Sequence, residues 1–425
     1  MFKIGKYFTT YSITAGLGIA ILGSLFLYMA YFDLSSRPIE SASALLFFWF
    51  LLRSDTKTWF WSGFFLSLLW FWWILVSFEQ YHMLWAIPLG ALFIAMVYGG
   101  IFGLIARLDK NISKYMSRQI GALANAPYIK ILGLLLLSYL HPLSFDWFKP
   151  ELLFVHTYLG VDKWQFAVVL FAILLSQYKK NILFLLLVLF AYSPSHTTVT
   201  YQNPDSHITL ANTMTTVEDK WNPKLVSSHI KEVLQIINQA IAKKKQIVVL
   251  PESVFPFFLN NKPKVLEALL ERSKQITIII GALYLDGKTH RNSTYIIQNG
   301  HYTIANKVRL VPFGESNPLP QWASRWVNKI FFDGAIDYIA SAEPTDFEIA
   351  GTSYRNAICY ESTSEALYRD APKQMIVTSN NGWFIPSIEP VEQRLLLTFY
   401  SRKYGTTIYH SVNMSPSYTI QRSRP

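Results

Sequence analysis

The amino-terminal half of this 425-residue chain consists of long apolar runs, which constrain the fold more than any other feature. A helix needs about 20 apolar residues to cross the hydrocarbon core of a bilayer. Runs of that length lie near residues 12–32, 58–78, 82–106 and 119–140. Shorter runs, which span only with help from flanking residues, lie at 41–52, 164–178 and 181–193. The pattern predicts a polytopic helical membrane domain of about seven helices over residues 1–195.

The placement of basic residues predicts the orientation of these helices. With seven spans and the amino terminus inside, the inner loops carry ten lysines and arginines, namely Lys3, Lys6, Arg53, Lys57, Arg107, Lys110, Lys114, Arg118, Lys179 and Lys180. The outer loops carry only Arg37, Lys149 and Lys163. Basic loops stay on the cytoplasmic side, so an odd number of spans puts residues 196–425 on the outer, periplasm-like side. Topology explains much of the formal charge of +11, and we expect no nucleic-acid partner.

Residues 196–425 read as a separate soluble domain that mixes strands and helices. Strands are predicted for short β-branched runs at 247–250, 276–280, 294–298, 357–359, 375–378 and 407–410. Helices are predicted at 225–243, 264–274 and 391–404, where apolar residues recur at helical spacing. Such a mixture is typical of a layered α/β domain.

Candidate catalytic residues follow three of the predicted strands. Glu252 is the next-to-last residue of the segment IVVLPES, Lys307 is the second residue of NKVRLVPFGE and precedes Glu315, and Cys359 stands in NAICYE. Side chains at strand ends of α/β folds are displayed over a crevice. Each residue alone has an ordinary explanation, as a turn carboxylate, a surface lysine and a core thiol. The combination, which includes the only cysteine of the chain, indicates a catalytic site.

The chemistry of these residues suits nucleophilic catalysis. A thiol attacks well only after it loses its proton, and a nearby base or cation promotes that loss. Glu252 is the candidate general base, and Lys307 is the candidate group that stabilises first the thiolate and then an oxyanion. Glu315 is expected to keep Lys307 charged and oriented.

The PESV, NKVRLVPFGE and ICYES segments resemble the three conserved regions of the nitrilase, or carbon–nitrogen hydrolase, superfamily. Together with the multi-span amino-terminal half, they resemble the bacterial apolipoprotein N-acyltransferase family. The later segment SNNGWF is similar to a family segment that has Asp in place of the second Asn. The resemblance implies an αββα sandwich for residues 196–425.

The resemblance also implies residue roles. Glu252 is then the general base, Lys307 the oxyanion-stabilising lysine, Cys359 the nucleophile and Glu315 the supporting glutamate. Tyr360 and Glu361 flank the nucleophile and are carried over as active-site residues. By the same resemblance Trp221 and Trp383 shape the substrate pocket, although both are equally well explained as packing aromatics.

The implied reaction is a two-step acyl transfer in the bacterial inner membrane, with the catalytic domain facing the periplasm. Cys359 takes an acyl chain from a phospholipid as a thioester, and the α-amine of a diacylglyceryl-modified cysteine on an apolipoprotein then takes it as an amide. Exclusion of water favours transfer over hydrolysis. The reaction implies no cofactor and no metal.

Alternative interpretations remain open from the sequence. The main one is a membrane-tethered amidase of the nitrilase type acting on a small amide, for which one membrane anchor suffices. A non-catalytic lipid-binding protein and a transporter are others, and the transporter is disfavoured because the amino-terminal half shows no evident buried charge or inverted repeat. The carboxyl end, after Val412-Asn413-Met414, is expected to be shorter than usual for the family and to complete the sandwich differently.

Overall fold

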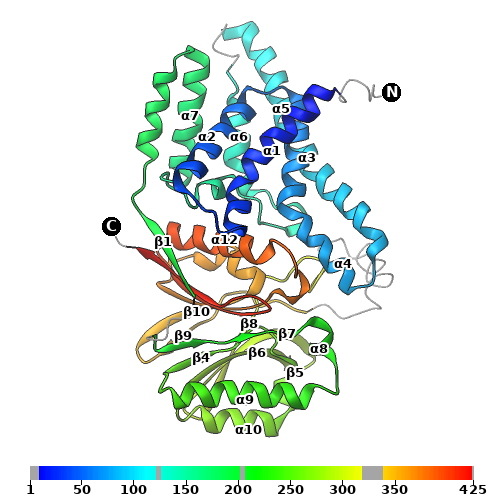
Figure 1. The fold of residues 1–425 in the computed structure, drawn as a ribbon, viewed down its shortest axis with the longest axis vertical. Coiled ribbons are helices and arrows are strands. Elements are labelled where there is room, and N and C mark those ends of the chain that lie inside the picture. The colour runs from blue at the N-terminus through cyan, green and yellow to red at the C-terminus, as the bar shows by residue number, and fades with distance from the viewer. Residues whose placement is uncertain (1–8, 121–125, 202–205, 318–337, 424–425) are drawn as a thin grey trace.

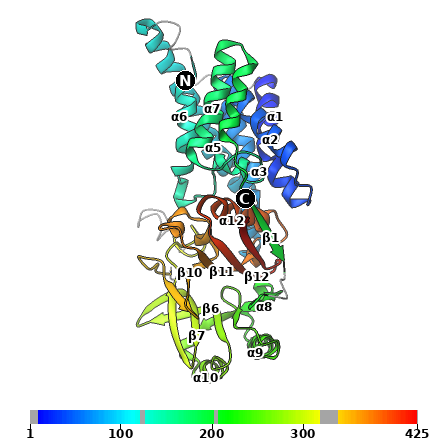
Figure 2. The ribbon, with the colours of Figure 1, turned by 90° about the vertical axis from the view of Figure 1, so that its left-hand side faces the viewer.

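The structure is a computed structural model that describes residues 9–120, 126–201, 206–317 and 338–423. Helices form one end of the molecule and a layered α/β unit forms the other (Figure 1). Viewed from the side, the helices stand side by side above the sheets (Figure 2). The predicted order of a helical membrane unit followed by an α/β unit is therefore confirmed.

The helical end contains the predicted apolar segments. Its main helices are α1 (Thr10–Tyr31), α2 (Arg37–Arg53), α3 (Thr56–Phe71), α5 (Ile87–Ile120), α6 (Tyr128–Leu136), α7 (Lys163–Lys179) and the 3₁₀ helix η8 (Ile182–Ala191). Short connecting helices are η2 (Trp72–Val76), α4 (Ser77–Gln80), η3 (Leu84–Ala86), η5 (Leu137–Tyr139), η6 (Pro142–Ser144) and η7 (Pro150–Phe154). In the described part of the chain, three helical stretches are long and apolar enough to cross a membrane, at Thr10–Tyr31, Thr56–Gln80 and Leu84–Met116. The total of seven spans stays a prediction.

The prediction of one long span over residues 119–140 was wrong. Helix α5 continues to Ile120, and a separate helix, α6, begins at Tyr128. Pro127 stands directly before α6. Proline lacks a backbone N–H and disfavours the helical conformation of the residue before it, so it separates helices that hydropathy alone joins.

The expectation that the helical half contains no buried charge was also wrong. Glu40, Asp109, Lys130, Asp146 and Glu151 are all buried. Two of them form hydrogen bonds with backbone groups at helix ends. Lys130 donates to the carbonyl oxygens of Leu52 and Ser54 at the end of α2, and Asp109 accepts from the backbone at the start of α6. Helix termini leave unpaired backbone groups, and hydropathy does not reveal which flanking charge packs against them.

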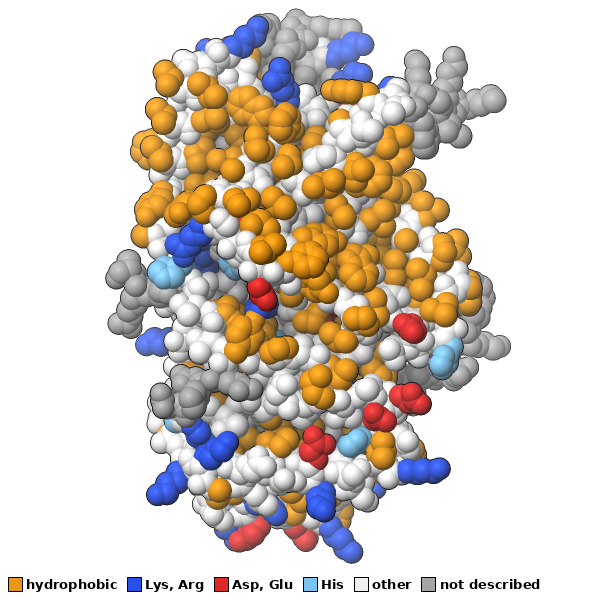
Figure 3. All heavy atoms as spheres, viewed as in Figure 1, with side chains coloured by type: hydrophobic (Ala, Val, Ile, Leu, Met, Phe, Trp, Pro, Cys, Tyr) orange, Lys and Arg blue, Asp and Glu red, His pale blue; other side chains and the backbone are white. Residues whose placement is uncertain are grey.

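The outer surface of the helical end is apolar. Side chains exposed there include Leu92, Phe93, Leu104, Phe171 and Phe190. In the space-filling view, hydrophobic side chains cover this end, with lysines and arginines at its tip and further charges on the α/β end (Figure 3). So large an apolar surface is expected of a protein whose helices face lipid.

The α/β unit contains two sheets. One has the order β2 (Ile208–Leu210), β4 (Ile247–Val249), β6 (Thr277–Asp286), β7 (Thr289–Gln298) and β8 (His301–Asn306), with β5 (Phe255–Phe258) beside β6. The other has the order β1 (His196–Tyr201), β13 (Tyr418–Ser423), β12 (Thr407–Asn413), β11 (Gln374–Asn380), β10 (Thr352–Ile358) and β9 (Asp346–Ile349), with β3 (Asn212–Thr213) beside β12. Strand β13 runs antiparallel between β1 and β12, so residues after Asn413 supply an inner strand of this sheet, and β1 forms its edge.

The remaining elements of this unit are helices. They are α8 (Val217–Trp221), α9 (Val226–Ala242), η9 (Leu259–Asn261), α10 (Pro263–Arg272), η10 (Cys359–Thr363), η11 (Glu365–Tyr368), η12 (Asn381–Trp383) and α12 (Glu389–Tyr404). Each predicted strand and helix corresponds to one of the elements found. Five of the strands are longer than predicted; for example, β6 continues to Asp286 and β7 already begins at Thr289.

The sheets and helices form four layers. Helices α9 and α10 pack against one sheet through a core that includes Val233, Ile237 and Ile278. The two sheets pack face to face through Ile208, Val249, Ile279, Ile376 and Tyr409, among others. Helix α12 covers the outer face of the second sheet and also contacts the helical half (Figure 1). The predicted αββα sandwich is confirmed.

Helix α12 connects the two halves with directed hydrogen bonds. The Trp73 Nε1 donates to Glu392 Oε2 at 2.7 Å. Arg402 donates to the carbonyl oxygens of Phe154 at 2.7 Å and of Ser195 at 3.0 Å. These contacts fix the outer layer of the sandwich against the ends of the helical segments, which is where the candidate site lies.

Candidate active site

The three predicted catalytic segments meet where the two sheets face each other. Glu252 lies in the turn after β4, and Lys307 directly follows β8 of the same sheet. Cys359 directly follows β10 of the other sheet. All three residues are buried. The fold therefore brings together side chains that are separated by up to 107 positions in the sequence.

Lys307 is held between two carboxylates. Its Nζ lies 3.1 Å from Glu252 Oε1 and 2.8 Å from Glu315 Oε2. Burial disfavours the charged ammonium, but the charges of Glu252 and Glu315 outweigh burial and raise the pKa of Lys307. Glu315 is itself fixed by the backbone N–H of Val311, which donates to its Oε2 at 2.9 Å. Glu315 thus contacts Lys307 directly, and its supporting role in catalysis stays a prediction.

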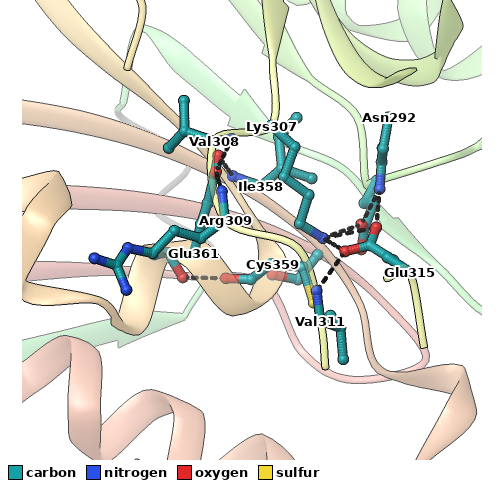
Figure 4. Close-up of polar contacts among 12 residues, drawn as sticks. Asn292, Lys307, Val308, Arg309, Val311, Glu315, Ile358, Cys359 and Glu361 are labelled. Atoms are coloured by element: carbon teal, nitrogen blue, oxygen red, sulfur yellow. Dashed lines mark hydrogen bonds and ion pairs between the residues drawn. The ribbon is translucent and has the colours of Figure 1, made fainter. Parts of the chain in front are cut away.

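Asn292, on β7, is a site residue that the sequence did not reveal. Its Nδ2 donates to Glu252 Oε1 at 2.8 Å and to Glu315 Oε1 at 2.6 Å. The amide nitrogen must face the carboxylates, because its oxygen in that place would repel them. Figure 4 shows Asn292, Lys307 and Glu315 gathered on one side, Val308, Arg309 and Glu361 on the other, and Cys359 between them.

The turn that carries Glu252 is tightly fixed. Ser253 has a positive φ of 47°, a backbone conformation that residues other than glycine seldom adopt. Gly281 on β6 makes room for this turn, because an added Cβ there would lie 2.6 Å from Glu252 Cα and 2.6 Å from the carbonyl oxygen of Pro251. Glycine at this position therefore sets how closely Glu252 approaches the sheet.

Cys359 also has a positive φ, of 52°, at the point where β10 turns into η10. Backbone strain of this kind is often found at functional sites. Burial raises the pKa of the Cys359 thiol well above its usual range, and the charge of Glu252 raises it further. Lys307 and a hydrogen bond from the backbone N–H of Asn380 act in the opposite direction. The thiol is neutral at rest, so its activation requires that its proton be taken within the site.

Glu361 braces the segment that carries Lys307. Its Oε2 accepts from the backbone N–H groups of Val308 at 2.6 Å and Arg309 at 3.1 Å, and its Oε1 accepts from Ile358 N at 2.8 Å. Burial raises the pKa of Glu361 to about 7, against the effect of these donors and Lys307. Glu361 thus joins the strand end of Cys359 to that of Lys307.

The three aromatic residues predicted for the site, Tyr360, Trp383 and Trp221, make their described contacts elsewhere than with Lys307. The Tyr360 hydroxyl donates to the carbonyl oxygen of Ser144 at 2.9 Å and accepts from Asp146 N at 3.2 Å, so it contacts the helical half. Trp383 stacks on Tyr81, with 5.5 Å between ring centroids. Trp221 ends α8 and its surface is 49% exposed. The substrate roles of these residues stay predictions.

Lys220, beside Trp221, is a second site cation that the sequence did not reveal. It is buried, and its Nζ donates to the carbonyl oxygen of Glu252 at 3.4 Å. Burial lowers the pKa of Lys220 to about 8, although the charges of Glu252 and Cys359 oppose this. The signal available in the sequence was only its position next to Trp221, because nothing local distinguishes a buried lysine from a solvated one.

This arrangement has the parts needed for nucleophilic acyl transfer. A neutral thiol lies beside a carboxylate that can take its proton, and a charged lysine lies beside both. The ammonium of Lys307 contacts one oxygen of Glu252 and both oxygens of Glu315, and its three N–H groups can also turn toward a developing oxyanion. The site adjoins α12, because Gln393 Nε2 lies 4.0 Å from Cys359 Sγ, and the next residue, Tyr360, contacts the helical half.

Comparison with known proteins identifies the family. Residues 10–195 match the family model described as the apolipoprotein N-acyltransferase integral membrane domain. The apolipoprotein N-acyltransferase of Wolinella succinogenes is 39% identical over 411 residues, which cover 94% of this chain and 95% of the relative. The chain belongs to the apolipoprotein N-acyltransferase family. The Helicobacter pylori member is 32% identical over 95% of this chain and 92% of its own length.

Solved structures similar to the chain include an amidase from Nesterenkonia sp., which is 11% identical, covers 52% of this chain and 92% of its own, and has a TM-score of 0.37. A CN-hydrolase superfamily protein from Xanthomonas campestris is 13% identical, covers 48% of this chain and 75% of its own, and has a TM-score of 0.36.

Membership of the apolipoprotein N-acyltransferase family confirms three predictions. The protein is an acyltransferase, it is an integral membrane protein, and its resemblance to this family is correct. The alternative of a membrane-tethered amidase has no better support.

Proposed function

We propose that this apolipoprotein N-acyltransferase uses Cys359 to carry an acyl chain from a phospholipid to the α-amine of a diacylglyceryl-modified cysteine on an apolipoprotein. The observation that carries the proposal is the placement of Lys307. Its buried ammonium lies between Glu252 and Glu315, and its charge acts on the single cysteine of the chain.

The first half-reaction forms the acyl-enzyme. Glu252 takes the Sγ proton as Sγ bonds to the ester carbon, and Lys307 stabilises the oxyanion. The ester C–O bond then breaks, and Glu252 returns the proton to the departing lysophospholipid oxygen. Transfer of the proton from Cys359 to Glu252 leaves the total charge of the buried site unchanged, which avoids the cost of a new buried charge.

The second half-reaction releases the product. The α-amine bonds to the thioester carbon, the C–S bond breaks, and the acyl chain leaves as an amide. Water competes for the same thioester, so a buried site favours the amine. Cys359 is 9% exposed, which agrees with this requirement.

The helical half supplies the membrane attachment in this proposal. Residues 1–195 form the membrane domain and residues 196–425 the catalytic domain, and the protein lies in the bacterial inner membrane with the catalytic domain in the periplasm. The basic loops predicted to lie inside support this orientation. A cysteine placed at exposed His196 in a Cys359→Ser background should react with a membrane-impermeant maleimide added outside whole spheroplasts. Labelling only after lysis would contradict the orientation.

The acyl-enzyme experiment tests the reaction. Purified protein incubated with phospholipid alone should gain the mass of one acyl chain on Cys359, and neutral hydroxylamine should remove it, because a thioester is more reactive than an ester. Cys359→Ser should lose apolipoprotein acylation and show no hydroxylamine-sensitive adduct. An adduct with small amides but none with phospholipid would instead support the amidase.

A further inference from the structure

Helix α12 presents a row of buried polar side chains toward the site. Glu389, Glu392 and Gln393 are each at most 2% exposed. Gln393 Nε2 lies 4.0 Å from Cys359 Sγ. Glu389 stands four residues before Gln393, and residues at this spacing share one face of a helix. Glu389 therefore lies on the face of α12 that adjoins the nucleophile.

Glu389 lacks a partner for its charge. Its Oε2 is buried and has no hydrogen-bond partner among the described residues. Glu392, one turn on, also has one buried oxygen without a partner, Oε1, but its Oε2 accepts from Trp73 Nε1 at 2.7 Å, whereas no side-chain hydrogen bond of Glu389 is found among the described residues. A buried carboxylate without a partner is costly, so it is retained only where a ligand satisfies it or where it does chemical work.

The groups around Glu389 show which kind of ligand is missing. The charges of Glu252 and Glu389 interact, and Glu389 in turn acts on Cys359, Glu392 and Tyr418. These four neighbours are acids, and no cation acts on Glu389 in the described part of the chain. A cationic ligand would complete this site.

The second half-reaction brings such a cation to Cys359. An α-amine has a pKa of about 7.7–8.0, so most acceptor molecules arrive as ammonium ions and must lose a proton before the nitrogen can attack. We propose that Glu389 binds the α-ammonium of the acceptor and removes its proton. This inference rests on the proposed thioester reaction at Cys359.

The protons balance in this step. As the ammonium ion arrives, the protonated Glu389 carboxyl releases its proton to solvent. The ammonium then gives one proton to the resulting Glu389 carboxylate and becomes a neutral amine. The amine nitrogen bonds to the thioester carbon while Glu252 takes a second proton from it, and that proton passes to Sγ as the C–S bond breaks. The products are the amide, the Cys359 thiol and a protonated Glu389, which is again in its resting form.

The acidity of Glu389 suits this role. Burial, with a contribution from the charge of Glu252, raises the pKa of Glu389 to about 8. Proton transfer is most effective between groups of similar pKa, and an α-amine matches this value. Before the acceptor arrives, Glu389 is mostly neutral at pH 7, so it does not oppose formation of the Cys359 thiolate.

The test separates the two half-reactions. Wild type, Glu389→Gln and the control Glu392→Gln are loaded with acyl chain from phospholipid, and the rate and extent of acyl-enzyme formation are measured. The loaded enzymes are then given a diacylglyceryl-cysteine peptide or, separately, hydroxylamine, which is already uncharged at neutral pH. Glu392→Gln is matched because glutamine can still accept from Trp73.

We expect Glu389→Gln to form the acyl-enzyme at a rate within twofold of wild type. Its transfer of the acyl chain to the peptide should be about 100-fold slower, in line with the loss of a general base. Its acyl-enzyme should react with hydroxylamine at the wild-type rate. Equal slowing of acylation and transfer, or unimpaired transfer to the peptide, would overturn the proposal. Failure of wild type to form any acyl-enzyme would refute the proposed function instead.

A phospholipid headgroup that carries an ammonium offers the same chemistry, so donors with ethanolamine and with glycerol headgroups are compared. If Glu389→Gln slows acylation from the ethanolamine donor alone, Glu389 recognises the donor and the proposal is wrong. If Glu389→Gln does not accumulate in the membrane, Glu389→Asp replaces it. That variant keeps the base but withdraws it by one methylene, and should slow peptide transfer at least tenfold with acylation unchanged.

Discussion

Asn292 offers a direct test of how the site holds its general base. Its side chain makes two hydrogen bonds to charged oxygens, one on Glu252 and one on Glu315. A hydrogen bond to a charged group is worth about 1.5–3 kcal/mol. Asn292→Ala removes both, and part of the loss is recovered because Lys307 still binds the same two carboxylates.

We expect a net loss of about 3 kcal/mol in the transition state for acylation, which corresponds to a rate decrease of roughly 100-fold. The assay is single-turnover formation of the acyl-enzyme on Cys359 from a labelled phospholipid. Asn292→Asp should be slower still, because a third carboxylate beside Glu252 and Glu315 adds repulsion without a donor.

Asn260 provides the matched control. Its side chain also makes two hydrogen bonds, to the backbone N–H and carbonyl of Leu285, at 3.2 and 2.9 Å, but it touches no carboxylate. Asn260→Ala should cost stability and leave the acylation rate of folded protein close to wild type. If Asn292→Ala acylates within threefold of wild type, or if Asn260→Ala slows acylation equally, the role assigned to Asn292 is refuted.

Two further predictions concern the packing and charge around Glu252. Gly281→Ala places a Cβ 2.6 Å from Glu252 Cα, so we expect a loss of about 1–3 kcal/mol in unfolding free energy together with slower acylation; unchanged values of both in detergent-solubilised protein would contradict it. Burial lowers the pKa of Lys220 from 10.5 to about 8. Between pH 8 and pH 10.5, Lys220 is therefore protonated in the unfolded chain but mostly neutral in the folded protein. Because the unfolded chain binds more protons, the unfolding free energy should rise with pH across this range. Lys220→Met should remove this rise and stabilise the protein by up to ~3 kcal/mol at pH 7, as measured by denaturant unfolding at pH 7 and pH 10; an equal slope in both proteins would exclude this account.

The catalytic segments were predictable because each is a local pattern. Glu252 and Cys359 follow apolar strands in the sequence, and strand ends are where such folds display reactive groups. Asn292 was not predictable in this way. It lies within β7, two residues before the stretch that hydrophobic patterning identified as a strand, and its role depends on two carboxylates from other segments. Its neighbours along the chain carry no sign of that contact.

The helical half shows the same division between local and tertiary information. Hydropathy located most of the apolar helices, because lipid exposure and core burial both require apolar side chains. It did not predict that Glu40 or Lys130 would be buried, since whether a charge at a helix end meets water or a neighbouring helix depends on packing. Pro127 was visible in the sequence, but its effect on the 119–140 run is apparent only where α6 begins.

The charges of the site explain how one buried pocket serves both a neutral donor and a cationic acceptor. Two carboxylates, Glu252 and Glu315, are balanced by two lysines, Lys307 and Lys220, and the thiol is neutral at rest. An uncharged ester can therefore be bound and cleaved with only an internal proton shift. An ammonium ion adds a positive charge that nothing in this balanced set neutralises. A mostly protonated carboxyl such as Glu389 can compensate by ionising when the cation arrives, because an opposite charge lowers the pKa of a carboxyl. On this reasoning, replacing Glu389 should harm only the step that uses a cation, whereas replacing Asn292 should harm both steps.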